Sequence, residues 1–285
     1  MIIKEEFNLS NNNSYKLNSI CKRAYFIENK NDIEFYFNEN SLENTIVLGS
    51  GHNVILTRNY YEENFLIFSQ KFNSYEIHQE FIKVAAGMDL RDLSVIAAEL
   101  NLSGLEVFYD IPSSVGGAVV MNAGASGEDI KGVLHSVTYF DPNKLCFDSI
   151  SEDELEMEYR NSFFQKNPQF IIVEVILKLT KSNKNLIWDK MNKIKKQRWE
   201  KQPRDYPNAG SVFKRPKGYY VGEMMDNLNL KGFSIGGAMI AEKHGGFIIN
   251  YDLASGKDII ELIDYIQEKV YSVYGFKLEV EQRLI

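Results

Sequence analysis

The sequence lacks several features that would define its class directly. Only two of its 285 residues are cysteines, Cys21 and Cys146, and a chain of this size needs no disulfide to hold its fold. No stretch reaches the roughly 18 consecutive apolar residues of a membrane span, and residues 1–10 contain no apolar signal segment. We therefore expect two free thiols in a soluble, cytoplasmic protein that does not insert into membranes.

Common cofactor and metal motifs are also missing. The sequence has no Walker A lysine motif, no HExxH and no CxxC. Gly49-Ser50-Gly51 begins like a dinucleotide-binding fingerprint, but the third glycine is absent and a strand pattern follows where a helix should. The histidines lie far apart without metal-ligand spacing; they are His52, His78, His135 and His244. We expect neither a Rossmann fold nor a metal site.

Charge is unevenly distributed along the chain. There are 32 Lys and Arg against 39 Asp and Glu, a net charge of −7, which excludes a polycation that coats nucleic acid. Between Lys181 and Lys217, however, twelve basic and three acidic residues give a local charge of +9 and leave −16 for the rest. Such a segment is either the solvated face of a helix or a site for an anionic small molecule, and charge alone leaves both open.

The hydrophobic pattern predicts strands at several places. Residues 45–48 form a short β-branched and apolar run that ends in a glycine loop, and the pattern resumes at 54–56. Residues 171–177 are apolar except for Glu174, which predicts a central, buried strand. The last segment, 278–285, alternates as one strand with Glu281 and Arg283 on the same face.

Two helices are predicted by apolar residues three and four apart. The first covers 89–100 with Asp89 as its N-cap, and the second begins at a capping-box pattern of Ser255 and Asp258 and runs to Gly275. With 44% hydrophobic and 25% charged residues the chain is globular. Because strands and helices alternate irregularly, we assign the class α+β.

Glycines gather in two blocks, six between Gly104 and Gly132 and eight between Gly210 and Gly246. Glycine is needed where the backbone takes a positive φ or where another group approaches it closely. These blocks belong to a series of five segments in the chain. They are Leu48-Gly49-Ser50-Gly51-His52-Asn53; Ser103-Gly104-Leu105-Glu106 with 111–118 and 121–125; Tyr159-Arg160-Asn161-Ser162-Phe163-Phe164; 208–214 with 230–232, 235–238 and 242–244; and Leu278-Glu279-Val280-Glu281-Gln282-Arg283.

Taken together, the five segments resemble the UDP-N-acetylenolpyruvoylglucosamine reductases, the MurB flavoenzymes, in order and spacing over about 13–285. The resemblance implies an α+β FAD-binding domain of two subdomains, like that of the vanillyl-alcohol oxidase (PCMH-like) proteins, and a smaller α+β substrate domain. We expect the FAD-binding domain at 1–200, with subdomains at about 1–57 and 58–200, and the substrate domain at 201–285. The short stretch between Phe170 and Asn208 resembles the compact branch, which lacks an extra substrate-covering loop.

The resemblance also implies which residues hold FAD. A glycine turn whose N–H groups converge can bind a pyrophosphate without a basic side chain. The expected cofactor residues are Gly49, Ser50, Gly51, His52, Asn53, Ser113, Ser114, Val115, Gly116, Gly117, Asn122, Gly124 and Ala125. His52 stands where the family usually has serine, so the hydroxyl contact made there is absent in this chain.

The implied reaction reduces the enolpyruvyl group of UDP-N-acetylglucosamine enolpyruvate to the lactyl ether of UDP-N-acetylmuramate, in peptidoglycan precursor synthesis. NADPH reduces FAD, and hydride then passes from the flavin to the vinyl carbon. The resemblance assigns the catalytic roles to Arg160, which binds the carboxylate, to Ser211, which donates the proton, and to Glu281, which assists. An unassisted hydroxyl is a poor acid, so a cation such as Lys214 or Lys201 should lie near Ser211.

The substrate contacts implied are Lys201, Lys214 and Arg215, the last in place of the asparagine of many relatives. We expect a small nucleotide sugar and NADPH as the only partners, no nucleic acid, and a monomer. Two alternatives stay open: a degenerate relative that binds flavin or nucleotide sugar without turnover, and a FAD-dependent alcohol oxidase of the wider fold that tethers its flavin covalently. The joint presence of Arg160, Ser211 and Glu281 favours the reductase.

Overall fold

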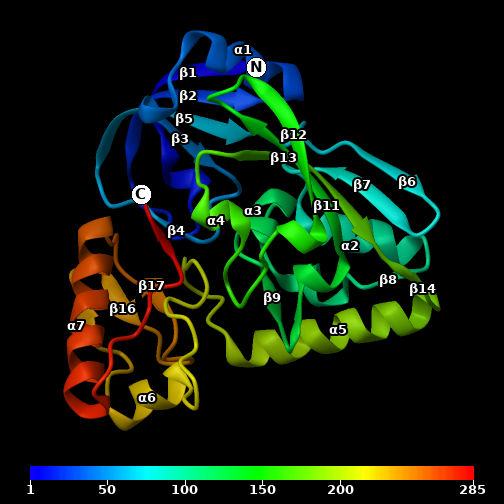
Figure 1. Ribbon diagram of the computed structural model, residues 1–285. Coiled ribbons are helices and arrows are strands. Elements are labelled where there is room, and N and C mark those ends of the chain that lie inside the picture. Colours follow the sequence, from blue (N-terminus) through cyan, green and yellow to red (C-terminus); the bar gives the residue numbers. More distant parts are fainter. The chain divides into compact units, whose positions relative to one another are not determined.

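A five-stranded antiparallel sheet forms the centre of the first of two units in the chain. The computed structural model describes residues 1–285. The first unit, unit 1, contains Met1–Glu5, Arg23–Ser50 and Glu63–Gln197. The strands lie in the order β12-β11-β13-β7-β6 (Figure 1). Their bounds are Cys146–Ser151, Leu134–Asp141, Ile171–Lys178, Phe81–Ala85 and Tyr75–His78. The apolar run predicted to be central is β13, the middle strand.

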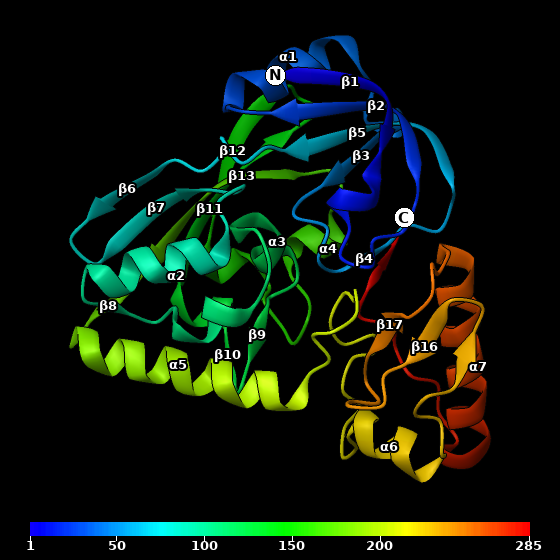
Figure 2. The ribbon, with the colours of Figure 1, turned by 180° about the vertical axis from the view of Figure 1, so that it is seen from behind.

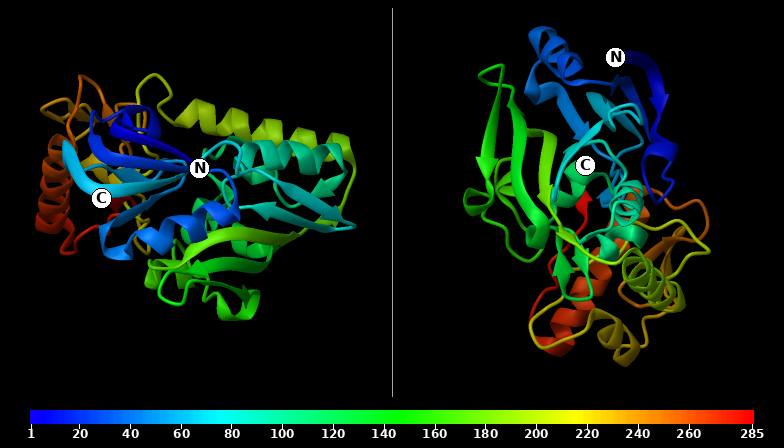
Figure 3. Two further views of the ribbon diagram at one scale, coloured as in Figure 1. Left: turned by 90° about the horizontal axis from the view of Figure 1, so that it is seen from above. Right: turned by 90° about the vertical axis from the view of Figure 1, so that its right-hand side faces the viewer.

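Helices α2 (Leu90–Glu99) and α3 (Val115–Val120) belong to the same unit, and so does α5 (Lys184–Lys201) as far as Gln197. Apolar side chains of α2 and α3 share one buried cluster with those of β7, β11 and β13. In turn, α5 packs on α2 through Ala98, Ile187 and Met191, and Figures 2 and 3 show the two helices side by side.

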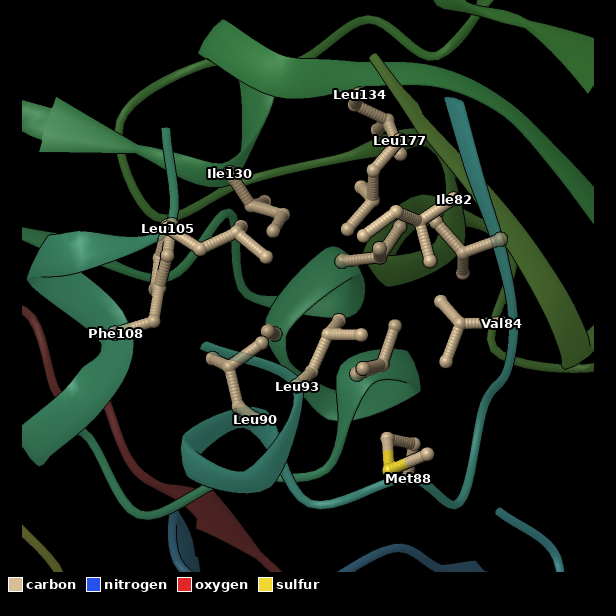
Figure 4. Close-up of a cluster of buried hydrophobic side chains, with 14 of the residues drawn as sticks. Ile82, Val84, Met88, Leu90, Leu93, Leu105, Phe108, Ile130, Leu134 and Leu177 are labelled. Atoms are coloured by element: carbon tan, nitrogen blue, oxygen red, sulfur yellow. The ribbon is translucent and has the colours of Figure 1, made fainter. Parts of the chain in front are cut away.

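The buried cluster explains the spacing of the helix α2 residues. Leu90 and Leu93, three apart in the sequence, both point into this cluster, and Leu105 and Phe108 lie on the Leu90 side of it (Figure 4). All four side chains are almost fully buried. Asp89 accepts hydrogen bonds from the N–H groups of Arg91 and Asp92, so the helix begins where its cap predicts.

A second sheet has the order β1-β2-β5-β3. Its strands are β1 (Ile2–Asn8), β2 (Ile20–Ile27), β5 (Tyr60–Phe68) and β3 (Thr45–Leu48), and β3 runs parallel to β5. Helix α1 (Lys30–Glu39) buries Ile33, Tyr36 and Phe37 in a cluster that also contains Val173 of β13. Within unit 1, residues of both sheets therefore share a core with α1.

Short elements complete unit 1. Two small ribbons pair β8 (Leu102–Ser103) with β14 (Thr180–Lys181) and β9 (Gly124–Ala125) with β10 (Glu128–Asp129), and α4 covers Phe163–Lys166. Between Phe170 and Asn208 the chain is taken up by β13, β14 and α5 and a short link. This stretch has no inserted loop, as expected of the compact branch.

Unit 2 contains Glu6–Lys22, Gly51–Glu62 and Arg198–Ile285. A three-stranded sheet of β15 (Ser234–Ile235), β16 (Ala238–Ile240) and β17 (Ile248–Asn250) lies against the long helix α7 (Gly256–Tyr274), and α6 spans Val221–Asn227 (Figure 1). In addition, β4 (Val54–Ile55) pairs in parallel with β18 (Arg283–Leu284).

The predicted limits of α7 are confirmed. The Ser255 hydroxyl accepts a hydrogen bond from Asp258 N–H at 3.2 Å, and the Asp258 carboxylate accepts one from Ser255 N–H at 2.8 Å. Gly275 ends the helix with φ of 78°, a left-handed conformation that glycine adopts without strain. Both cysteines are free, with Cys21 buried and Cys146 exposed. No helix is both long and apolar enough to cross a membrane.

The prediction of one strand over 278–285 is wrong for most of that segment. Regular pairing is confined to Arg283–Leu284, and Val280 makes only an isolated bridge to Phe213. The reason is a change of partner: Glu281 N–H donates to Val212 O, whereas Arg283 N–H donates to Asn53 O. A segment that pairs first with one chain stretch and then with another cannot form one continuous ladder.

The packing units do not follow the predicted domain bounds. Unit 2 includes two segments, Glu6–Lys22 and Gly51–Glu62, that lie inside the predicted FAD-binding region 1–200. Packing units group residues by their contacts, whereas the predicted domains group them by the ligand that they bind. The functional division at 200/201, and the subdomains at about 1–57 and 58–200, therefore stay predictions.

Replacing Ser255 by Ala removes the N-terminal cap of α7 and should lower the free energy of unfolding by about 1 kcal/mol. Ser272 offers a matched control in the same helix, because its hydroxyl only donates to Lys269 O on an exposed face. We expect Ser272→Ala to change stability by less than about 0.5 kcal/mol. Denaturant unfolding of both variants measures the difference, and equal losses would contradict the assigned role of the cap.

Candidate active site

The glycine loop at 49–53 is shaped by a close backbone approach. Gly51 has φ of +70°, and a Cβ there would lie 1.9 Å from Asn12 O. Ser14 N–H also donates to Gly51 O at 3.0 Å. Only glycine fits a position with both constraints, so the turn predicted from sequence is held against the N-terminal segment of unit 2.

Three serine hydroxyls meet two glycines in unit 1. The Ser50 hydroxyl accepts a hydrogen bond from Ser114 N–H at 2.9 Å. A Cβ on Gly49 would lie 3.0 Å from Ser114 Oγ, and one on Gly117 would lie 3.2 Å from the hydroxyls of both Ser113 and Ser114. We call these five residues the serine cradle; any side chain at either glycine would crowd its hydroxyls.

The backbone donors beside the serine cradle are used within the protein. Val115 N–H donates to Met88 O at 2.9 Å, and Gly116 N–H donates to Ala86 O at 2.8 Å. Val115 is fully buried. Val115 and Gly116 therefore fix the loop to the residues that directly follow β7. With these N–H groups already bonded, the polar groups that remain in this region are mainly hydroxyls.

Asn122 joins several segments of unit 1. Its side chain is 1% exposed, and its amide nitrogen donates to Asp129 Oδ2 and to Glu158 O. Its side-chain oxygen accepts from Lys131 N–H. Because these bonds occupy the amide, any role of Asn122 toward a cofactor would have to come from its backbone.

Arg160 is oriented by backbone carbonyls near the same loop. Its Nη1 donates to Asn122 O at 3.1 Å and its Nη2 to Gly124 O at 2.7 Å. Its backbone has φ of 53°, which is unusual for a residue with a side chain, and Gln165 Nε2 donates to its carbonyl at 2.8 Å. These two carbonyls fix the direction of the guanidinium, whose planar fork of donors suits it to bind an anion.

In unit 2, the segments of Ser211 and Glu281 lie next to each other. Glu281 N–H donates to Val212 O at 2.8 Å, and Ser211 forms an isolated bridge with Phe247. The loop residue Asn53 donates through Nδ2 to Glu281 O at 3.2 Å. The structure thus brings together the second part of the glycine loop and two of the three predicted catalytic residues, whereas Arg160 belongs to unit 1.

Seven of the twelve basic residues of this segment lie on helix α5, and lysines among them pair with acidic residues of unit 1. On α5, Lys184 pairs with Glu99, and Lys190 pairs with Glu128 at 2.8 Å and with the buried Glu106 at 3.7 Å. Burial acts to raise the pKa of Glu106, but hydrogen bonds from Ser103 and backbone N–H groups, with the Lys190 charge, hold that pKa below its ordinary value. The solvated-helix interpretation therefore applies to the part of the segment that lies on α5.

The three predicted substrate residues have different surroundings. Lys214 Nζ lies 2.6 Å from Glu279 Oε1, so a carboxylate offsets its charge. Arg215 stacks on Tyr220, with its guanidinium carbon 3.8 Å from the ring centroid. Lys201 is the exposed last residue of α5.

His244 is a residue to which the sequence assigned no role. Burial lowers its pKa, and the positive charges of Lys231 and Lys201 lower it further. Its Nδ1 accepts a hydrogen bond from Gly246 N–H at 3.1 Å, and Gly246 O in turn accepts from Val212 N–H. The turn that contains His244 thus connects the surroundings of Lys201 to the Ser211 segment. Only the pairing of 212 with 246 reveals this link.

Comparison with known proteins first defines the class. Residues 36–143 match the model of the FAD binding domain. Residues 202–285 match the C-terminal domain of UDP-N-acetylenolpyruvoylglucosamine reductase. The fold and the first match define an α+β flavin-binding protein.

Relatives over the whole chain define the family. A UDP-N-acetylenolpyruvoylglucosamine reductase from Francisella tularensis is 38% identical over 99% of this chain and all of its own length, and one from Thermosipho melanesiensis is 41% identical over 85% of this chain and 82% of its own. The crystal structure of the reductase (MurB) from Thermus caldophilus matches with a TM-score of 0.86 and 30% identity over 99% of both chains. The chain belongs to the UDP-N-acetylenolpyruvoylglucosamine reductase family.

The residues present fit a flavin dinucleotide. Phosphate oxygens accept hydrogen bonds, and the serine cradle presents hydroxyls where the two glycines keep the backbone accessible. The positive φ at Gly51 and the absence of acidic residues from 49–53 and 113–117 also suit an anionic group.

The lowered pKa of His244 predicts how stability depends on pH. The folded protein favours the neutral imidazole, so this contribution is complete above the ordinary pKa of about 6.5 and is lost as the pH falls below it. We expect His244→Gln to lose less stability than the wild type between about pH 7 and 5.5. The exposed His78 is the control, and His78→Gln should retain the wild-type profile in thermal unfolding. Parallel profiles for all three proteins would contradict the assignment.

Proposed function

We propose that the protein is an NADPH-dependent, FAD-containing reductase that converts UDP-N-acetylglucosamine enolpyruvate to UDP-N-acetylmuramate in peptidoglycan precursor synthesis. The observation that carries the proposal is the pairing of the Ser211 and Glu281 segments, with Asn53 of the glycine loop bonded to Glu281 O at 3.2 Å. Family membership supports the substrate class. We further propose a cytoplasmic monomer whose substrate contacts lie mainly in 201–285.

The cofactor would be held by the glycine loop and the serine cradle. Gly49, Ser50, Ser113, Ser114 and Gly117 supply hydroxyls and an accessible backbone. Gly51, His52 and Asn53 continue the loop, and Val115, Gly116, Asn122, Gly124 and Ala125 shape it from behind or through their backbone. Bound FAD would supply hydride transfer, accepting a hydride from NADPH and delivering it to the terminal vinyl carbon of the substrate.

Arg160 is proposed to bind the substrate carboxylate. Hydride addition places negative charge on the carbon that bears this group, and that charge must be stabilised in the transition state. A guanidinium remains charged at all working pH values and can bind a carboxylate with two parallel hydrogen bonds. The carbonyls of Asn122 and Gly124 would hold it ready, so little reorganisation is needed.

Ser211 is proposed to donate a proton to the same carbon, which balances the added hydride. A serine hydroxyl needs help to act as an acid. Lys214 is less suited to that help because Glu279 offsets its charge at 2.6 Å, so we assign it to Lys201, the exposed last residue of α5. Glu281 would assist in protonated form or through water, since a bare carboxylate would repel the developing charge.

An anaerobic titration tests the function directly. The purified protein, loaded with FAD, should bleach on addition of NADPH and regain its flavin absorbance on addition of UDP-N-acetylglucosamine enolpyruvate, with UDP-N-acetylmuramate as product. A protein that cannot be loaded with FAD would refute the proposal. Reduction by NADPH without reoxidation by substrate would favour the degenerate relative, and a flavin that stays on the denatured chain would favour the alcohol oxidase.

Ser211→Ala should separate the two half-reactions. Flavin reduction by NADPH needs no proton from Ser211 and should keep its wild-type rate, whereas reoxidation by substrate should slow by roughly 10²- to 10⁴-fold, the usual contribution of a general acid. Stopped-flow absorbance measures both rates, with Ser272→Ala as the control. Equal slowing of both half-reactions would show that Ser211 does not have this role.

A further inference from the structure

Gln282 makes an unusual set of contacts beside the proposed catalytic pair. Its side chain is 4% exposed, and Nε2 lies 3.1 Å from Ala209 O, 3.2 Å from Gly210 O and 3.4 Å from Ser211 O. The two hydrogens of one amide nitrogen thus serve three successive carbonyls of the turn that ends at Ser211, and at least one hydrogen is shared between two of them.

Tyr15 fixes the orientation of that amide. The phenol is fully buried, and its hydroxyl donates to Gln282 Oε1 at 2.9 Å. Burial raises the pKa of Tyr15 far above its ordinary value, so the hydroxyl keeps its proton. With the oxygen of the amide held by Tyr15, the NH₂ group must face the carbonyls. Asn250 Nδ2 in turn holds Tyr15 O at 2.8 Å.

The Ser211 turn needs such a support because it lacks a regular strand. Residues 209–214 make only isolated bridges, Ser211 to Phe247 and Phe213 to Val280. Gly210 has φ of +82° and no atom within 4 Å of a Cβ, so no side-chain packing fixes the turn at Gly210 itself, although Ala209, Val212 and Phe213 on either side are buried. Gln282 is bonded covalently to Glu281, and its side chain reaches the opposite segment.

We propose that Gln282, oriented by Tyr15, is the positioning residue that sets Ser211 relative to Glu281 for the proton-transfer step. The inference rests on the proposed function of Ser211. Misplacement of a catalytic group by about 1 Å can cost roughly 100-fold in rate. Because the Gln282 side chain contacts the backbone carbonyls of residues 209–211, it affects catalysis without touching the substrate.

Gln282→Met tests the inference, because methionine keeps the length of the side chain and removes its hydrogen bonds. In the FAD-loaded protein we expect flavin reduction by NADPH to stay within twofold of wild type and reoxidation by UDP-N-acetylglucosamine enolpyruvate to slow by roughly 10- to 100-fold. The kcat should fall while KM changes less than threefold. Gln267→Met is the matched control, since Gln267 Nε2 donates to Leu278 O of the same terminal segment; it should leave both half-reactions unchanged.

A double variant distinguishes positioning from general destabilisation. If Gln282 acts through Ser211, reoxidation in Ser211→Ala/Gln282→Met should be within twofold of Ser211→Ala alone, because the group being positioned is already gone. Multiplied effects would overturn the inference. Tyr15→Phe removes one hydroxyl and should slow only reoxidation, by a few-fold; it decides the question if Gln282→Met does not fold.

The outcomes separate the inference from the function on which it depends. A wild-type protein that the substrate does not reoxidise overturns both. An active wild type whose Gln282→Met variant reoxidises within twofold of normal, or slows equally in both half-reactions, overturns the inference and leaves the proposed function standing.

Discussion

The pairing of the last seven residues with two other stretches of unit 2 is the constraint on which the proposed site depends. Glu279 and Glu281 bond to the backbone of Lys214 and Val212, and Arg283 bonds to Asn53. Ile285 O then accepts hydrogen bonds from Thr57 N–H, from Thr57 Oγ1 and from Tyr61 Oη. Segments more than 200 residues apart are therefore joined by backbone bonds, and the positions of Ser211, Glu281 and the glycine loop follow from them.

Features set by local interactions were predictable from the sequence. The caps of α2 and α7 involve residues within three positions of each other, and the apolar run of β13 requires burial on both faces. The free thiols and the α+β class were predicted on similar grounds. Such features depend on the chain within a few residues, which the sequence displays directly.

Features set by distant partners were not predictable. The strand expected at 278–285 divides between two partners, and the donors of Val115 and Gly116 are used by carbonyls of Ala86 and Met88. The charge of Lys214 is offset by Glu279, whereas the sequence placed it in a strongly basic run. The role of Gln282 could not be predicted either, because the three carbonyls that its amide contacts lie about 70 residues earlier in the chain.

The pairing of the C-terminal segment also determines when the site can form. Residues 279–285 are synthesised after the other residues of the proposed site, yet they complete the surroundings of Ser211 and bind the loop that begins near residue 49. Unit 1 carries the serine cradle and Arg160 within its own residues. During synthesis all residues of the serine cradle are therefore made long before the residues that support the proposed proton donor. A chain interrupted before residue 279 would contain the cradle but lack these supports.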